Sequence, residues 1–183
     1  KLTIFFIKKN FLIYGLGKSG LSTFNFLKKQ NQVFIYDDKK NIDKNKEIKK
    51  NLINYKELSN LNIDFIVISP GIDIHKCNLK KFLKKNIKKI HTDLDIFFSY
   101  FNKNKKITIT GTNGKSTTAK LLFEILKDQN KDVKLVGNIG IPILFKKNIK
   151  ASTIFVIEAS SYQLDYSKYF KTDYAFILNI IPY

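Results

Sequence analysis

A glycine-rich segment in the second half of the chain carries the residue types that bind polyphosphate. It consists of Gly111, Thr112, Asn113, Gly114, Lys115, Ser116 and Thr117. Glycines let backbone N–H groups approach a phosphate, a lysine neutralises the terminal phosphates, and a serine hydroxyl can bind Mg²⁺. We predict that this segment binds ATP, with Lys115 as the catalytic residue and Ser116 on the metal. Ile109 stands where the usual pattern has its first glycine, so the alternative is a glycine turn with an incidental lysine.

Glu158 is the candidate second ligand for Mg²⁺. It follows the apolar run 154–157, which predicts a buried strand, and Mg²⁺ commonly takes a carboxylate together with phosphate oxygens. An acid at the carboxyl edge of a parallel sheet lies where ligands bind. The alternative is a solvated acid at a strand end. The small polar residues at 159–163 favour a functional role.

A second glycine-rich turn lies near the start of the chain. Residues 15–20 match G-x-G-x-x-G after an apolar run, and Asp37 ends the next run, near the roughly 20-residue offset of a ribose-binding acid. The turn predicts an anion, such as a diphosphate, at a helix N-terminus, with Lys18 and Ser19 in direct contact. Taken alone, it also fits NAD. The turn 69–71 would lie beside it at the sheet edge, or be an ordinary turn.

The positions of these segments imply an α/β fold with two strand–loop–helix units. Strands are predicted at 10–14, 33–36, 65–68, 107–110, 133–136, 153–157 and 174–178, with a weak one at 52–55. Alternating strands and helices predict parallel sheets covered on both sides. We place a domain boundary in the polar stretch at 102–106. It separates a Rossmann-like domain (1–101) from a truncated P-loop NTPase-like central domain (102–183).

Composition limits the other functions. The chain has 183 residues, a formal net charge of +18, one cysteine, and no apolar run of the roughly 20 residues that span a bilayer. Because the lysines are spread along the whole chain, we interpret them as solvated positions rather than a nucleic-acid surface. We therefore expect a cytoplasmic protein without nucleic-acid or membrane partners.

The order of the motifs resembles the Mur ligase family. The matching segments are Gly-Leu-Gly-Lys-Ser-Gly (15–20), Ser-Pro-Gly-Ile (69–72), Thr-Gly-Thr-Asn-Gly-Lys-Ser-Thr (110–117), Gly-Asn-Ile-Gly (137–140), Glu-Ala-Ser-Ser-Tyr-Gln-Leu (158–164) and Leu-Asn-Ile (178–180). The likeness runs from about Phe11 to Asn179. The first two segments favour the D-glutamate-adding member of the family.

The resemblance implies that the first turn holds a uridine diphosphate sugar instead of NAD. The residues that match substrate-contacting positions are Lys18, Ser19, Asp37, Asp38, Lys39, Gly71, Asn138, Ser160, Ser161 and Gln163. A small hydroxyl residue is common in the family at Asp38, so this position departs from the pattern. Glu158 matches the magnesium-binding acid.

The chemistry implied is ATP-dependent amide formation through an acyl phosphate. The substrates would be UDP-N-acetylmuramoyl-L-alanine and D-glutamate, and the full-length protein is expected to be a monomer. The last residues read as a strand entering a loop, and the family's pattern continues beyond them. We therefore expect a fragment that is inactive alone. The alternatives are an NAD-dependent oxidoreductase domain and a Mur ligase for another amino acid.

Overall fold

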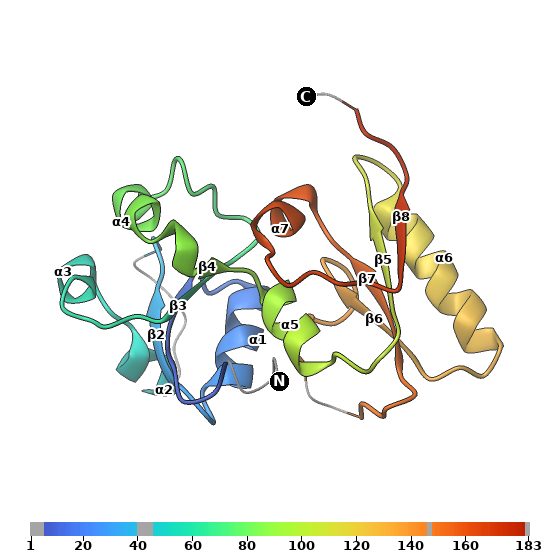
Figure 1. The fold of residues 1–183 in the computed structure, drawn as a ribbon, viewed down its shortest axis with the longest axis horizontal. Helices are drawn as coiled ribbons and strands as arrows, with labels where there is room; N and C mark the ends of the chain where they lie inside the picture. Colours follow the sequence, from blue (N-terminus) through green and yellow to red (C-terminus); the bar gives the residue numbers. More distant parts are fainter. Residues whose placement is uncertain (1–5, 40–45, 146–147, 182–183) are drawn as a thin grey trace.

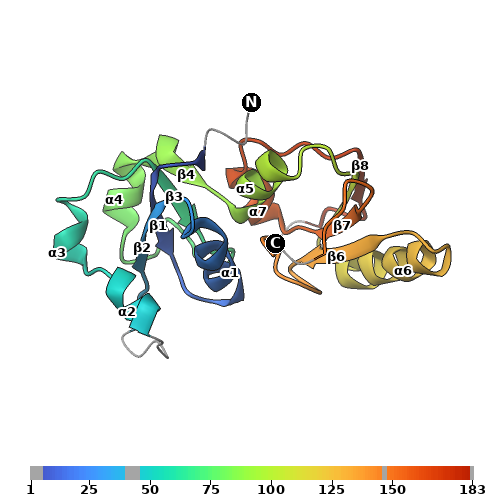
Figure 2. The same cartoon turned by 90° about the horizontal axis from the view of Figure 1, so that it is seen from below.

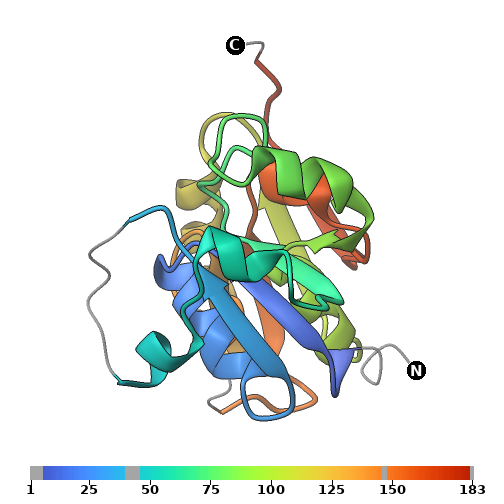
Figure 3. The same cartoon turned by 90° about the vertical axis from the view of Figure 1, so that its left-hand side faces the viewer.

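The computed structural model describes residues 6–39, 46–145 and 148–181, and the ends of both predicted domains, 1–5 and 182–183, lie outside these ranges. Two parallel sheets stand side by side along the longest axis of the molecule (Figure 1). Figure 3 looks along this axis from the side of the first sheet. The predicted α/β class, with a Rossmann-like half before a P-loop-like half, is confirmed.

The first sheet has the strand order β2-β1-β3-β4, with all neighbours parallel. Its strands are β1 (Asn10–Tyr14), β2 (Gln32–Tyr36), β3 (Phe65–Ile68) and β4 (Ile90–His91). Its helices are α1 (Lys18–Leu27), α2 (Lys46–Asn51), α3 (Tyr55–Leu58), α4 (Lys80–Lys85) and a 3₁₀ turn (Ile87–Lys89). The weak strand predicted at 52–55 is wrong: Leu52 makes a single bridge to Ile35, and α3 begins at Tyr55.

Alternating side chains of β1 pack into two different hydrophobic cores, one on each face of the sheet. Phe11 and Ile13 face α1 and α2, whereas Leu12 and Tyr14 pack in a second cluster with residues of α3 and α4. Successive side chains of a strand point to opposite faces, so both faces of this sheet are covered. That coverage explains why its strands are continuous apolar runs in the sequence.

The second sheet has the order β6-β7-β5-β8 and is also parallel. Its strands are β5 (Lys106–Thr110), β6 (Val133–Gly137), β7 (Ile154–Glu158) and β8 (Tyr174–Ile177), with helices α6 (Lys115–Asp128) and α7 (Ser161–Tyr166). Helix α6 packs on one face through Ala119 and the partly buried Leu122, Phe123 and Leu126. All the strong strand predictions are confirmed to within about one residue.

Helix α5 (Asp93–Tyr100) lies between the two sheets (Figures 1 and 2). Seven of its eight residues are buried. The ring of Phe97 meets that of Phe155 in β7 edge-to-face, with centroids 4.8 Å apart. The largest hydrophobic cluster includes Phe24 of α1 and Leu144 after β6, so one continuous core joins the two halves. The predicted boundary at 102 falls in the connection after α5 and stays a prediction.

The edge strand β8 departs from the expected coverage. All four of its residues are exposed, including Tyr174 at 58% and Ile177 at 63%. Within the described ranges, β8 pairs with β5 on one side only, because the sheet order places it at the edge. The prediction that both faces of the sheet are covered is therefore wrong at this strand.

Asp95 organises the buried polar contacts between β4, α5 and the segment after α7. Its carboxylate accepts hydrogen bonds from His91 Nδ1 at 2.8 Å and from Ser167 Oγ, Lys168 N and Tyr169 N at 2.7 Å. Burial raises the pKa of Asp95, but the hydrogen bonds from His91 and Ser167 outweigh this effect, and the net pKa is lowered. The carboxylate therefore stabilises the fold in its ionised form.

We expect Asp95→Asn to lower the free energy of unfolding at pH 7 by about 2 kcal/mol, since hydrogen bonds to a buried charge are lost. Because the folded pKa lies below the unfolded value of about 3.9, this contribution is present above that pH and lost as pH falls through the folded pKa. Urea unfolding at pH 7 and at several values below 4 measures both effects. Asp128→Asn, at the exposed end of α6, is the matched control. Equal acid sensitivity of wild type and Asp95→Asn would contradict the assignment.

Candidate functional site

The first glycine turn forms one wall of a pocket of about 550 Å³. The pocket lies where β1, β2 and β3 end, at the carboxyl edge of the first sheet, and is lined by residues 14–19, 37–39 and 69–72. All six residues predicted here from the sequence line it, namely Lys18, Ser19, Asp37, Asp38, Lys39 and Gly71. Parallel strands and their loops thus bring distant segments together at the edge where ligands bind.

The two aspartates of this pocket brace its walls. Asp37 Oδ2 accepts from Leu16 N at 2.6 Å, and its Oδ1 accepts from Lys39 N at 2.8 Å. Asp38 accepts from the Tyr14 hydroxyl at 2.7 Å and from Asn78 Nδ2 at 2.8 Å. Burial and the bond to Asp38 raise the pKa of Tyr14, which keeps its hydroxyl a donor. Both carboxylates are therefore engaged within the protein, and Asp37 is not free for ribose hydroxyls.

The second glycine loop connects β5 to α6. Gly111 and Gly114 have φ of 142° and 82°, in the range that favours glycine. The N–H groups of Thr112 and Asn113 converge on Asn179 Oδ1, at 3.0 and 2.9 Å. Successive N–H groups aimed at a single oxygen form the concavity that binds anions. In this loop an amide oxygen, that of Asn179, occupies the concavity, and the predicted binding of phosphate there stays a prediction.

Lys115 lies across this loop. Its Nζ donates to the carbonyl oxygens of Gly111 at 2.6 Å and Thr112 at 3.0 Å. In the part of the chain that the structure describes, Lys115 makes no ion pair with an acid. Neutral carbonyls bind an ammonium group less strongly than a phosphate does. The ammonium group of Lys115 can therefore exchange these carbonyl partners for an anion.

Glu158 ends β7 beside the glycine loop. In the sheet register it pairs with Ile109 of β5 on one side and Gly137 of β6 on the other. Its side chain is buried, and among the described residues its Oε2 has no hydrogen-bond partner. The unpartnered carboxylate oxygen at the end of β7 and the exposed Ser116 hydroxyl at the start of α6 are hard oxygen donors of the kind that Mg²⁺ prefers. The residues present fit the predicted metal.

The remaining predicted residues occupy different positions around this edge. Asn138 is exposed, and its N–H donates to the carbonyl oxygen of Glu158 at 3.1 Å. Ser161 lines a cavity of about 640 Å³ together with Gly111 and Thr112. Gln163, by contrast, is 3% exposed.

The carboxamide of Gln163 faces the protein interior. Its Oε1 accepts from Ser160 N at 3.1 Å in the capping box that starts α7. Its Nε2 donates to Asp93 at 3.3 Å. Gln163 therefore makes its hydrogen bonds within the protein, where it holds the start of α7 in place.

Sequence reasoning missed two residues of this region as site residues. Asn179 fills the loop concavity, and Asp93 joins Ser19 to Gln163. Asn179 was visible only as part of the Leu-Asn-Ile segment. Asp93 follows Thr92, which forms a capping box with Asp95, and this T-x-x-D spacing is a readable signal for a helix start.

Asn179→Ala should loosen the loop. Asn113 N–H loses its acceptor, whereas Thr112 N–H keeps a weaker contact with the main-chain oxygen of residue 179 at 3.2 Å. We expect amide hydrogen exchange at Asn113 to rise about fivefold, and at Thr112 by less, since one such bond contributes about 1 kcal/mol. Exchange followed by NMR checks this, with the exposed Asn102→Ala as control. Unchanged protection at Asn113 would contradict the contact.

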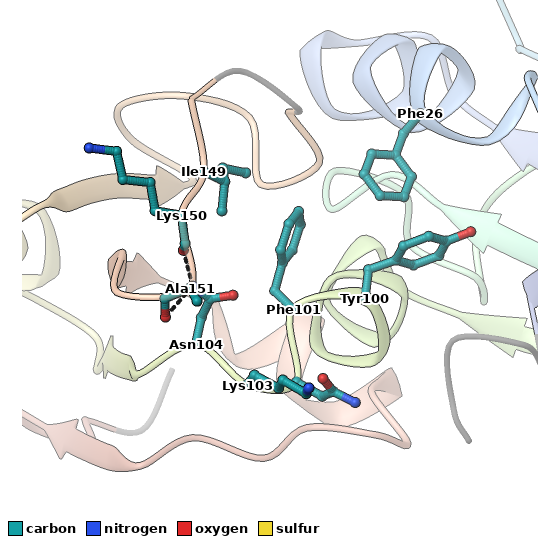
Figure 4. Close-up of a pocket in the computed structure, with 9 residues that line it drawn as sticks. Phe26, Tyr100, Phe101, Lys103, Asn104, Ile149, Lys150 and Ala151 are labelled. Atoms are coloured by element: carbon teal, nitrogen blue, oxygen red, sulfur yellow. Dashed lines mark hydrogen bonds between the residues drawn. The ribbon is translucent and has the colours of Figure 1, made fainter.

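Figure 4 shows a further cavity, of about 430 Å³. It is lined by Phe26 of α1, Tyr100 and Phe101 at the end of α5, and residues 149–151 before β7. Asn104 closes one side by donating to the carbonyls of Lys150 and Thr153 at 2.8 and 3.0 Å. None of the residues predicted for the site lines this cavity.

Comparison with known families defines the class of protein. Residues 9–91 match the family model for the Mur ligase MurD-like N-terminal domain, and residues 109–182 match that for the Mur ligase middle domain. These matches span both sheets and both glycine loops, so the chain belongs to the Mur ligase family.

Individual relatives point to one branch of this family. The chain is 41% identical over 186 residues to the UDP-N-acetylmuramoylalanine–D-glutamate ligase of Caldicellulosiruptor bescii, covering 95% of this chain and 40% of that protein. It is 38% identical over 178 residues to the enzyme of the same name from Rickettsia bellii, covering 96% of this chain and 39% of that protein. The chain thus spans about two-fifths of the length of these relatives.

Solved structures support the fold. A UDP-N-acetylmuramate:L-alanyl-γ-D-glutamyl-meso-diaminopimelate ligase from Neisseria meningitides covers 95% of this chain and 61% of its own, with a TM-score of 0.56 at 16% identity. A murein peptide ligase from Psychrobacter arcticus covers 94% and 43%, with a TM-score of 0.53 at 13% identity. In the described part of the chain, no helix is both long enough and apolar enough to cross a membrane.

Proposed function

We propose that this chain supplies the UDP-sugar pocket and the ATP loop of a ligase that adds D-glutamate to UDP-N-acetylmuramoyl-L-alanine. The observation that carries the proposal is that one chain has two places whose geometry suits an anion. One is the pocket at the carboxyl edge of the first sheet, and the other is the loop concavity at that of the second. The names of the relatives supply the identity of the substrates. A cytoplasmic location belongs to the same proposal.

In this proposal the first pocket binds the uridine diphosphate group. The N-terminus of α1 and the residues Lys18 and Ser19 meet the diphosphate, and Lys39, which also lines the pocket, adds positive charge. The segment braced by Asp37 and Asp38 shapes the uridine side. Both carboxylates keep their internal hydrogen bonds. They therefore contribute by fixing the shape of the pocket wall, without contacting the ligand.

At the second sheet, the glycine loop and Lys115 bind the ATP phosphates, and Ser116 and Glu158 would hold Mg²⁺. When bound, Mg²⁺ supplies charge neutralisation for the transferred phosphoryl group. The substrate carboxylate takes the γ-phosphoryl group to give an acyl phosphate. The amine of D-glutamate then displaces phosphate and forms the amide. Lys115 stabilises the charge on the transferred group, since this chemistry depends mainly on positioning and electrostatics.

Asn138, Ser160 and Ser161 are proposed to line the path of the substrate between the two sites. Ser161 shares its cavity with the glycine loop, and Asn138 lies next to Glu158 along the sheet edge. Gln163 contributes to this region through the start of α7.

Equilibrium binding tests the proposal. Titration calorimetry with UDP-N-acetylmuramoyl-L-alanine, with a non-hydrolysable ATP analogue plus Mg²⁺, and with NADH should show binding of the first two only. Tight binding of NADH without affinity for the UDP sugar would favour the oxidoreductase alternative. The commitment of Asp37 to the backbone of Leu16 and Lys39 argues against that outcome.

A further inference from the structure

Asp93 is a buried carboxylate placed between the two proposed binding regions. It is the first residue of α5 and is 4% exposed. Its Oδ2 accepts a hydrogen bond from the hydroxyl of Ser19, which lies in α1 beside the first sheet. Its Oδ1 accepts from Gln163 Nε2, from α7 of the second sheet, at 3.3 Å. A single carboxylate therefore connects a residue of the UDP-sugar pocket to a residue beside the ATP site.

The Ser19 hydroxyl cannot donate a hydrogen bond to Asp93 and to a ligand at the same time. A serine hydroxyl has one proton and donates it to one acceptor. Ser19 lines the 550 Å³ pocket while its proton is held by Asp93. A diphosphate oxygen that accepts this proton must break the bond between Ser19 and Asp93. Asp93 then loses one of its two side-chain donors, in a place that is closed to water.

The effect of this loss reaches the second sheet through Gln163. Burial is the main cause that raises the pKa of Asp93, and the bonds from Ser19 and Gln163 act against it. When the hydrogen bond from Ser19 is lost, the remaining bond from Gln163 contributes more of the stabilisation of the carboxylate. The other end of the Gln163 carboxamide holds Ser160 N at the start of α7. A change at Ser19 is thereby transmitted to the N-terminus of α7.

We propose that Asp93 is a positioning residue that competes with the bound diphosphate for the Ser19 hydroxyl and so couples the UDP-sugar pocket to Gln163. The inference rests on the proposed function, because it requires a diphosphate in the first pocket. Asp93 itself does not touch the ligand. It holds the Ser19 hydroxyl by a hydrogen bond until the ligand accepts that bond instead. Loss of the bond to Ser19 then changes the contact between Asp93 and Gln163 in the second sheet's half of the chain.

The first test is the dissociation constant of UDP-N-acetylmuramoyl-L-alanine, measured by calorimetry. Asp93→Asn weakens the competing acceptor, so we expect about tenfold tighter binding, and Ser19→Ala removes the hydroxyl and should bind about tenfold more weakly. Adding Asp93→Asn to Ser19→Ala should change nothing further. Equal effects of Asp93→Asn in both backgrounds, or unchanged or weaker binding by Asp93→Asn alone, would overturn the proposal. Asp128→Asn controls for the loss of one negative charge.

The second test follows the side-chain amide signals of Gln163 by NMR while the same ligand is added. In the wild type they should shift, although Gln163 does not line the pocket, and in Ser19→Ala they should stay in place. Persistence of the shift in Ser19→Ala would overturn the coupling, even if Asp93→Asn does not fold. A wild-type chain that fails to bind the ligand would instead refute the proposed function, and the coupling with it.

Discussion

Lys115→Ala is expected to weaken binding of ATP about 100-fold, the equivalent of about 3 kcal/mol. Lys115 is the charged group of the loop, and its present partners are the carbonyl oxygens of Gly111 and Thr112. Exchange of two neutral carbonyl acceptors for phosphate oxygens turns a contact between a charge and a dipole into an ion pair, which is stronger. Fluorescence titration with a labelled, non-hydrolysable ATP analogue in the presence of Mg²⁺ measures the loss.

Lys120→Ala provides the matched control for this prediction. Lys120 lies on the same helix, α6, and is exposed. It should retain wild-type affinity apart from a small, salt-dependent change. Thermal unfolding of both variants separates loss of binding from loss of structure. If Lys115→Ala binds the analogue as tightly as Lys120→Ala does, the loop is not a phosphate site.

Gly20→Ala is expected to cause the largest loss of stability, about 3 kcal/mol, because small-to-large changes in a packed contact force the backbone apart. A methyl group at this position would lie 1.8 Å from the carbonyl oxygen of Gly15 and 3.1 Å from Ser69 Oγ. Helix α1 must then move away from β1, and the wall of the 550 Å³ pocket moves with it. Urea unfolding measures the stability, and binding of the UDP sugar should fall in parallel.

Gly17→Ala is the control for this contact. Gly17 is the N-cap of α1 with φ of −65°, and a methyl group there would meet no heavy atom within 4 Å. Its unfolding midpoint should stay near that of the wild type. Equal destabilisation by the two substitutions would mean that the close approach of α1 to β1 is not what requires glycine at position 20.

Local patterns in the sequence were sufficient to predict most of the fold. The strands around Ile66 and Val156 are short apolar runs bounded by polar or glycine residues, and burial on both faces of a parallel sheet produces this pattern. The glycine loops were recognised because their geometry requires particular residues in sequence. Helix α5 was missed because nearly all of its sides are buried, so it lacks the polar face that gives a helical period.

The parts of the site that escaped prediction depend on contacts between distant residues. Asn179 meets Asn113 across 66 positions, and Asp93 meets Ser19 across 74. No local pattern encodes such pairs. Gln163 matched a substrate position by resemblance, but only its three-dimensional partners show that its carboxamide is held inside the protein.

The aromatic packing of α5 has a mechanical consequence. Because Phe97 and Phe155 belong to one unbroken interior, the two sheets resist opening like a hinge, since any rotation between them would separate rings that are in contact. The two proposed binding regions, one on each sheet, are therefore held at a set spacing by a rigid shared core.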